Sequence, residues 1–336
     1  MNAIKDIFGI INVNKPKGFT SHDVVAKLRK ILKIKQIGHT GTLDPMATGV
    51  LPVCIGKATK TIQYLESSKA YRAFIKLGVK TDTYDMEGQI LEKNPVNLEI
   101  EEIKKHLESF RGDIIQTPPI YSAVHYKGKR LYEYARKNIE ITDIPTRKVT
   151  VNSIEPVKIL TDDTEVNLQS SCHCERSEAI HQSLTNQWIA SLQAPLNDEN
   201  PVLIVDIDCS EGTYIRSIAH DLGEKLGYGA CLSDLIRTKA GKFTLETTYT
   251  LEEIESFSQS ENFDKFLINP IKILPLEIFE IDENLLDKIK NGQYFSVDFL
   301  THSPKSSSFL QLVFKNKLAA IARFEDNIIK PVNVFI

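Results

Sequence analysis

The chain has 336 residues, of which 42% are hydrophobic and 25% are charged, and its formal net charge is −3. This composition is typical of a soluble globular protein and excludes a chain that is disordered throughout, while the length predicts two domains. No stretch approaches the ~18 consecutive apolar residues that a membrane span needs. Five cysteines are an odd and sparse set that argues against a disulfide framework. They indicate a reducing compartment, so we expect a cytoplasmic protein that does not bind a membrane.

Charge is distributed unevenly along the chain. Residues 1–60 contain ten Lys and Arg against three acidic residues, residues 111–150 contain eight against four, and residues 251–336 contain nine against thirteen. A near-neutral protein with a basic first segment is expected when one face of the molecule meets a polyanion. Solvated surface lysines explain such counts at least as often, so charge alone does not identify a partner.

The first third of the chain contains several predicted elements. Residues 8–18, FGIINVNKPKG, predict a short strand that ends at a Pro/Gly turn. Thr20 and Ser21 then cap a predicted helix with one apolar face through residue 32. Residues 38–60 are rich in Gly and Thr and show no periodicity. Residues 71–77 alternate as a half-buried strand does, and residues 100–110 predict a helix that ends at Gly112.

The rest of the chain continues the mixture of strands and helices. Residues 118–148 predict a long loop with a helical piece, residues 201–209 a strand, and residues 213–226 a helix that ends at Gly227. Thr250 and Glu253 form a capping-box pattern. Residues 309–324 predict a hairpin that turns at Asn316 and Lys317. This irregular order predicts an α+β fold with a mixed, largely antiparallel central sheet flanked by helices and loops.

One segment, residues 165–199, interrupts two predicted strands with a low-complexity run rich in Ser, Gln and Asn. We expect this insert to be disordered and dispensable. Its residues Cys172, His173, Cys174 and His181 have the side chains of a zinc site, but only one residue separates the two cysteines. Structural zinc sites usually have two to four residues there, so the spacing argues against a metal.

Common cofactor motifs are absent from the sequence. Gly56 and Lys57 lack the earlier glycine and the following Ser or Thr of a P-loop, and Gly227 and Gly229 lack the third glycine of a dinucleotide fingerprint. There is no Cys-x-x-Cys of the kind that zinc-dependent base deaminases use. We therefore predict chemistry carried out by side chains alone, with no cofactor and no metal.

Residues 38–52, GHTGTLDPMATGVLP, form the densest cluster of special residues in the chain. The glycines allow close backbone approach, and Pro45 restricts Asp44 to an extended conformation. A carboxylate on a rigid loop of small residues is well placed to attack a substrate. In isolation, an ordinary Asp-Pro turn is the simpler interpretation.

This segment resembles the catalytic motif of the TruB family, the bacterial synthases that convert uridine 55 in the T arm of tRNA to pseudouridine. Four further segments resemble family motifs in the family's order, namely NKPKGFTS at 14–21, KAYR at 69–72, QTPPIYSA at 116–123 and CSEGTYIR at 209–216. The resemblance covers roughly residues 8–250 apart from the insert.

The resemblance also implies a domain organisation. It predicts a pseudouridine-synthase catalytic domain at residues 1–250, in which residues 118–148 grip the RNA. A helical linker at 251–274 then leads to a small, mostly-β, PUA-like RNA-binding domain at 275–336, on the resemblance of segments such as LPLEIFEID and PVNVF.

Three residues have catalytic roles by this resemblance. Asp44 is the expected nucleophile, and Arg216 is expected to orient its carboxylate and keep it charged. Tyr214 is a candidate for the base that abstracts a proton, or else a wall of the pocket. Without the resemblance, Arg216 would be read as an ordinary surface ion pair.

Four residues are expected to bind the substrate. By resemblance, Tyr71 stacks on the flipped uracil and Leu235 packs beside it, while His39 occupies the space that the flipped nucleotide leaves. Lys15 is expected to make a structural or a phosphate contact rather than to act as a catalytic acid.

The leading prediction is a monomeric, cofactor-free RNA isomerase that extracts a uridine from the T-arm stem-loop of tRNA. The alternative is a tRNA-binding chaperone with weak or lost isomerase activity, because a bulky insert between two pocket-bearing elements could damage the site.

Overall fold

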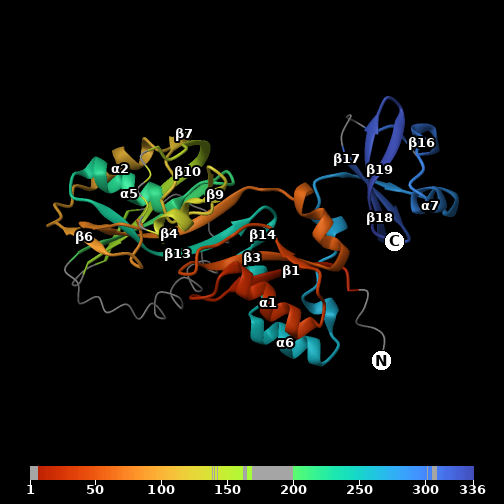
Figure 1. The fold of residues 1–336 in the computed structure, drawn as a ribbon, viewed down its shortest axis with the longest axis horizontal. Helices are drawn as coiled ribbons and strands as arrows, with labels where there is room; N and C mark the ends of the chain where they lie inside the picture. The colour runs from red at the N-terminus through yellow and green to blue at the C-terminus, as the bar shows by residue number, and fades with distance from the viewer. Residues whose placement is uncertain are drawn as a thin grey trace. The chain divides into compact units, whose positions relative to one another are not determined.

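The computed structural model describes residues 7–137, 139, 141, 143–161, 165–168, 200–300, 302–304 and 309–336 (Figure 1). The chain divides into two compact units, of which unit 1 comprises Met1–Ser68 and Arg237–Ile336 and unit 2 comprises Lys69–Ile236. This division follows contacts rather than chain order, so the predicted domain boundaries at 250 and 274 stay a prediction. None of the helices in the described ranges is long and apolar enough to cross a membrane.

The centre of unit 1 is an antiparallel ladder of β1 (Gly9–Lys15) and β3 (Thr48–Ile55), in which Gly9 pairs with Ile55 and Lys15 with Gly49. Strand β2 (Ile37–His39) pairs with the end of β3, and the last part of β13 (Ala230–Ala240) pairs with β14 (Phe243–Thr244). Every residue of β3 is buried. A strand buried on both faces has no polar alternation, which is why residues 48–55 show no strand period in the sequence.

Two helices pack against this ladder. Helix α1 (Ser21–Leu32) begins at a capping box of Thr20 and Asp23, and α6 (Leu251–Gln259) begins at the predicted box of Thr250 and Glu253. Figure 1 shows the two helices side by side, and their apolar faces share one core with β1 and β3. Both predicted helix starts are therefore confirmed.

The last sixty residues of unit 1 form a five-stranded sheet with its own core. Its strands, in spatial order, are β15 (Glu277–Glu280), β17 (Phe309–Phe314), β18 (Lys317–Glu325), β19 (Ile328–Val334) and β16 (Phe295–Ser296). The hairpin of β17 and β18 turns at Lys315 and Asn316, with φ values of 47° and 62°. Its turn lies one residue earlier than predicted, because both central residues adopt the left-handed conformation that a two-residue hairpin requires.

This sheet confirms the predicted mostly-β C-terminal fold. Helix α7 (Glu283–Lys290), which the sequence analysis did not predict, covers part of it. The remaining helices described in unit 1 are 3₁₀ helices, of which η2 has nine residues and the others three each. They are η2 (Gly56–Tyr64), η3 (Leu245–Thr247), η4 (Phe263–Lys265), η5 (Pro270–Lys272) and η6 (Val297–Phe299).

Unit 2 is built on a sheet with the strand order β13, β4 (Lys69–Leu77), β12 (Val202–Cys209), β10 (Arg147–Leu160) and β11 (Glu165–Asn167). The pairs from β4 to β11 are antiparallel. Strand β7 (Gly112–Gln116) also pairs with β10. The alternating residues 71–77 and 201–209 thus form neighbouring strands, with Tyr71 opposite Ile207. Together with the helices, these sheets confirm the α+β class.

Helices α2 (Ile100–Glu108) and α5 (Ile215–Leu226) pack on each other in unit 2. Helix α5 ends at Gly227 with a φ of 81°, as predicted. Two hairpins complete the unit: β5 (Val79–Thr81) with β6 (Ile90–Lys93), and β8 (His125–Tyr126) with β9 (Lys129–Arg130), which leads into α3 (Leu131–Ala135). The expected loop at 118–148 therefore contains a hairpin besides its helical piece, and its last two residues belong to β10.

Glu165–Asn167, at the start of the predicted insert, form β11 and pair with β10. Residues 169–199, with Cys172, His173, Cys174 and His181, lie outside the described residues. The predictions of disorder and of no zinc site there are therefore not tested by the structure.

Candidate active site

The residues predicted for the active site belong to both units. Unit 1 contains Lys15, His39 and Asp44, and unit 2 contains Tyr71, Tyr214, Arg216 and Leu235.

Asp44 lies in the loop of residues 40–47 that connects β2 to β3. Leu43 and Met46 on either side are buried, whereas Asp44 is half-buried. The amide of Ala47 donates to the carbonyl of Asp44 at 3.1 Å, and the amide of Thr40 donates to that of Pro52 at 3.1 Å. The apolar side chains of Leu43 and Met46 anchor the loop on either side of Asp44.

Lys15 at the end of β1 is fully buried, and its ammonium donates to the carbonyls of Pro16 at 3.1 Å, Pro45 at 3.2 Å and Phe19. The bond to Pro45 joins the 16–19 turn to the residue directly after Asp44. A buried ammonium that donates to backbone carbonyls favours a structural role for Lys15 over a phosphate contact.

Arg237 in β13 is a second fully buried cation beside the same loop. Its guanidinium donates to the carbonyls of Val50 at 2.6 Å, Gly41 at 3.2 Å and Thr42 at 3.4 Å. Gly49 allows the backbone of Arg237 to lie close to β3, since a Cβ at Gly49 would lie 2.4 Å from the Arg237 carbonyl oxygen and the residue has a φ of 97°. Sequence reasoning missed Arg237, because the sequence of a strand that also contains Asp234 and Lys239 does not show which groups this cation contacts.

His39 ends β2 and packs edge to face on His22, with ring centroids 5.3 Å apart. Burial lowers the pKa of His39, and the nearby His22 and Arg237 lower it further. Its Nδ1 has no hydrogen-bond partner among the residues that the structure describes. The site therefore favours a neutral imidazole at this position.

In unit 2, Arg216 lies in the first turn of α5 and is 5% exposed. Its Nη1 donates to the Thr83 carbonyl and to Oδ2 of Asp85, both at 3.2 Å, and its Nη2 donates to the Tyr121 carbonyl at 3.0 Å. The interpretation of Arg216 as a surface ion pair is therefore wrong, because the residue is buried. A buried guanidinium requires hydrogen-bond partners such as these.

Asp85 was not predicted from the sequence, although it is buried at the centre of this arrangement. Its second carboxylate oxygen, Oδ1, accepts from the Thr83 hydroxyl at 2.6 Å and from the Glu87 amide at 3.1 Å. The carboxylate is therefore held on both oxygens, and it fixes the Arg216 guanidinium in one position.

Tyr214 is the residue directly before α5, and Gln116 holds its backbone on both sides. The Tyr214 amide donates to Oε1 of Gln116 at 2.7 Å, and Nε2 of Gln116 donates to the Tyr214 carbonyl at 2.9 Å. The Arg147 guanidinium lies 5.3 Å from the centre of the Tyr214 ring. Helix α5 has no side-chain cap of its own, so the buried Gln116 fixes the start of the helix that carries Arg216.

Tyr71 and Leu235 are both buried, on the neighbouring strands β4 and β13. Their roles beside the uracil stay predictions. In the described part of the chain, no group of three or more His, Cys, Asp or Glu side chains is arranged to hold a metal ion.

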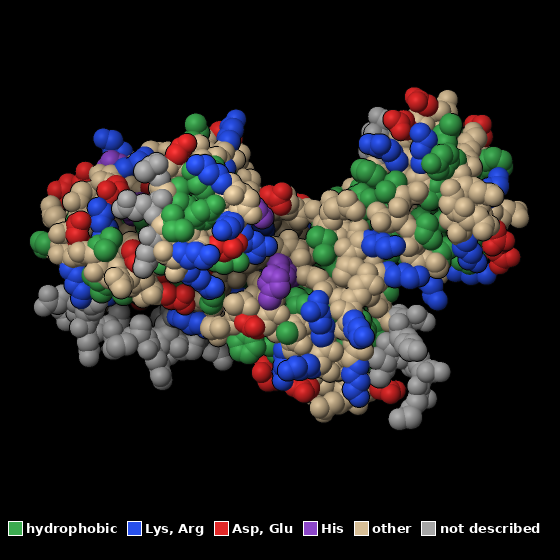
Figure 2. Space-filling model, in the orientation of Figure 1, with side chains coloured by type: hydrophobic (Ala, Val, Ile, Leu, Met, Phe, Trp, Pro, Cys, Tyr) green, Lys and Arg blue, Asp and Glu red, His purple; other side chains and the backbone are tan. Residues whose placement is uncertain are grey.

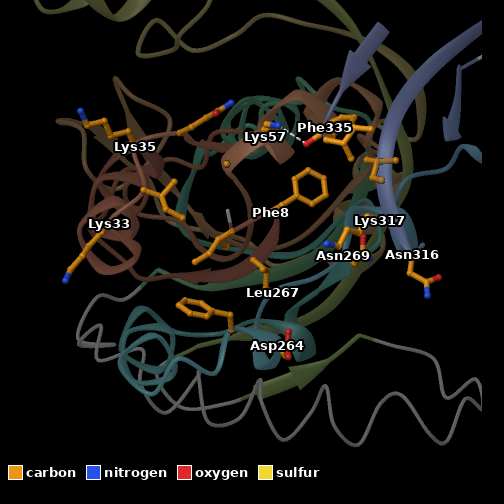
Figure 3. Close-up of a pocket in the computed structure, with 17 residues that line it drawn as sticks. Phe8, Lys33, Lys35, Lys57, Asp264, Leu267, Asn269, Asn316, Lys317 and Phe335 are labelled. Atoms are coloured by element: carbon orange, nitrogen blue, oxygen red, sulfur yellow. Dashed lines mark hydrogen bonds between the residues drawn. The ribbon is translucent and has the colours of Figure 1, made fainter. Parts of the chain in front are cut away.

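A cavity of 1140 Å³ in unit 1 is separate from this site (Figure 3). Phe8, Gly56 and Leu267 line it, and in Figure 3 the Lys57 ammonium donates to the Phe335 carbonyl at its edge, at 2.9 Å. The cavity lies at the Gly9–Ile55 end of the β1–β3 ladder, the end opposite the Asp44 loop. None of the predicted site residues lines it.

Comparison with known proteins identifies the class of protein that this fold defines. A profile of the TruB family pseudouridylate synthase N-terminal domain matches residues 29–180, and one of the tRNA pseudouridylate synthase B C-terminal domain matches residues 216–279. A crystal structure of a Cbf5-Nop10-Gar1 complex is similar over 98% of this chain and 85% of that chain, with 25% identity and a TM-score of 0.65. A structure of an H/ACA RNP bound to a substrate RNA containing 2'-deoxyuridine shares the fold, at 23% identity over 98% and 85% of the chains and a TM-score of 0.65. The fold is that of the pseudouridine synthases.

Curated relatives specify the family. The tRNA pseudouridine synthase B of Clostridium tetani is 39% identical over 94% of this chain and 95% of its own length. That of Caldanaerobacter subterraneus subsp. tengcongensis is 44% identical over 85% of each chain. The chain belongs to the TruB family, which confirms the resemblance seen in the sequence motifs.

Proposed function

We propose that this protein is an isomerase that converts uridine 55 in the T arm of tRNA to pseudouridine without a cofactor. The family membership supports the activity, and the observation that carries the assignment of the site is the Asp44 loop. Asp44 is half-buried, and backbone carbonyls of its loop accept hydrogen bonds from two fully buried cations, Lys15 and Arg237. Such a loop presents a nucleophile in one defined position.

The reaction breaks the bond between N1 of uracil and C1′ of ribose, rotates the base and joins C5 to C1′, while C5 loses its proton to a base or solvent and N1 gains one. No electron or group is gained or lost, so an ionised carboxylate and a sheltered pocket suffice. The uridine must first leave the base stack, as for other enzymes that act on a base. In this proposal Asp44 is the nucleophile and Arg216, held by Asp85, orients it.

The remaining site residues form the proposed base pocket. Tyr71 stacks on the uracil and Leu235 packs beside it, while Tyr214 is the base or a wall near C5. His39 enters the vacated space in the RNA stack, which its pKa supports because a neutral imidazole stacks without a charge to solvate.

RNA binding is assigned mainly to residues 118–148. Five basic side chains in the first part of this segment are exposed, namely Lys127, Lys129, Arg130, Arg136 and Lys137. Two of them lie over tyrosine rings, Lys127 over Tyr126 at 5.0 Å and Arg136 over Tyr132 at 5.2 Å. Phosphate contacts from such a segment supply affinity, and the shape of the RNA loop supplies selectivity.

Figure 2 shows that Lys and Arg side chains on the visible face of each unit are mixed with acidic ones. Charge does not outline a single RNA surface there, so shape and base contacts are expected to carry much of the recognition. The proposal includes an RNA-binding role for the C-terminal domain at 275–336, a monomeric state and a cytoplasmic location, where the tRNA substrate is found.

The test is release of tritium from an unmodified T-arm stem-loop labelled at uracil C5, in the absence of metal and nucleotide. The unchanged protein should release tritium, and Asp44→Asn should release none while its RNA affinity stays within a few fold. Asp287→Asn, an exposed carboxylate on α7, is the matched control and should behave as the unchanged protein. Release by Asp44→Asn would overturn the assignment of the nucleophile. Tight binding without release by the unchanged protein would favour the chaperone instead.

A further inference from the structure

The segment that carries Asp85 is a turn, residues 82–88, between β5 and β6. Strand β13 fixes its middle, since the Leu232 amide donates to the Tyr84 carbonyl at 2.9 Å and the Met86 amide donates to the Leu232 carbonyl at 3.0 Å. Within this turn Tyr84 has a φ of 65°. The left-handed conformation is unfavourable for a bulky residue, so an interaction of the Tyr84 side chain is expected to offset its cost.

The Tyr84 ring stacks on His220 of α5, with centroids 3.8 Å apart and ring planes inclined by 10°. His220 lies four residues after Arg216, so both side chains project from the same face of the helix. Nδ1 of His220 has no hydrogen-bond partner within the described ranges, and the stack on Tyr84 orients this ring. Burial lowers the pKa of His220, and the pair is a neutral aromatic stack at neutral pH.

The neighbours of Tyr84 in the chain both bind Arg216. The carbonyl of Thr83 and the carboxylate of Asp85 accept hydrogen bonds from the same nitrogen, Nη1, each at 3.2 Å. The turn is therefore attached to one face of α5 at two points, by the guanidinium and one helical turn later by the ring stack. Rotation of the turn about one attachment is prevented by the other.

We propose that Tyr84 and His220 are positioning residues for isomerisation, because their stack holds the 82–88 turn where Asp85 and Thr83 orient the Arg216 guanidinium. Neither residue touches the substrate in this proposal. The inference rests on the proposed function and deepens it, since it names side chains beyond the family motifs that set the geometry of the site.

The turn offers a matched pair of variants. Tyr84→Asn removes the ring and keeps a residue that tolerates the left-handed conformation, whereas Tyr84→Phe keeps the ring and removes only the hydroxyl. His220→Ala removes the other half of the stack. The full-length protein is used throughout, and thermal unfolding of each variant is recorded to confirm folding.

The measurement is the single-turnover rate of tritium release at saturating T-arm stem-loop, with the dissociation constant of the RNA measured separately. We expect Tyr84→Asn and His220→Ala to lower the rate by about tenfold, within the roughly hundredfold effect of misplacing a catalytic group. The dissociation constant should stay within twofold, and Tyr84→Phe should match the unchanged protein. The double variant should be no slower than the slower single variant, because both remove one interaction.

Three results would overturn the inference. These are an unchanged rate in Tyr84→Asn, a loss of RNA affinity equal to the loss of rate, and additive effects in the double variant. Each is distinct from failure of the proposed function, in which the unchanged protein itself releases no tritium.

Discussion

Replacement of Lys15 by methionine tests how the Asp44 loop is held. Methionine keeps the length and apolar stem of the side chain but removes the ammonium that donates to the carbonyls of Pro16, Phe19 and Pro45. The Pro45 carbonyl still accepts a hydrogen bond from the Gly18 amide at 2.8 Å after the substitution, so only the losses at the Pro16 and Phe19 carbonyls are counted. At about 1.5 kcal/mol for each hydrogen bond to a charged group, the free energy of unfolding should fall by about 3 kcal/mol.

The same substitution should slow the reaction, because the bond to Pro45 lies next to Asp44, the proposed nucleophile. Urea unfolding gives the stability, and single-turnover tritium release gives the rate. Lys17→Met is the matched control, since Lys17 is exposed and its loss should change the unfolding free energy by less than about 0.5 kcal/mol.

The two interpretations of Lys15 make opposite predictions in this assay. A structural lysine lowers stability and rate and leaves the salt dependence of RNA binding unchanged. Unchanged stability, together with weaker RNA binding and a salt slope reduced by about one, would refute the structural reasoning and indicate a phosphate contact.

Two further predictions concern titrating groups. Because the pKa of His39 is lowered on folding, the unfolded chain binds more protons at this site below about pH 6.5, and stability is lost as the pH falls through that window. Between about pH 7.5 and 5.5, the free energy of urea unfolding should therefore fall less in His39→Gln than in the unchanged protein. In the control His125→Gln, which changes an exposed histidine, it should fall as much as in the unchanged protein. An equal fall in both variants would contradict a lowered pKa of His39. Burial raises the thiol pKa of Cys54 to about 12, of Cys209 to about 11 and of Cys231 to about 12. A protein with Cys172→Ser and Cys174→Ser should therefore not react with a thiol reagent at pH ~8 until it is unfolded. Rapid labelling of the native protein would contradict the burial of these three cysteines.

Local features of the fold were predictable from the sequence. The helix starts at Thr20 and Thr250 depend on partners three residues away, and the end of α5 depends on the conformation of Gly227 alone. The half-buried strand at 71–77 has one polar face, so its alternation is visible. The position of Asp44 on a loop and the family itself were also predictable, because both rest on contiguous motifs.

The tertiary structure decided how the site residues are held. Strand β3 is buried on both faces and has no period to detect, and Arg237 reaches the carbonyl of Val50, 187 positions earlier in the chain. Asp85 and Arg216 are 131 positions apart, and the stack of Tyr84 on His220 depends on the same packing. A charged group is retained in the interior only where folding supplies its partners. Sequence spacing does not encode those partners, so the side chains that fix the Asp44 loop and Arg216 are visible only in the folded protein.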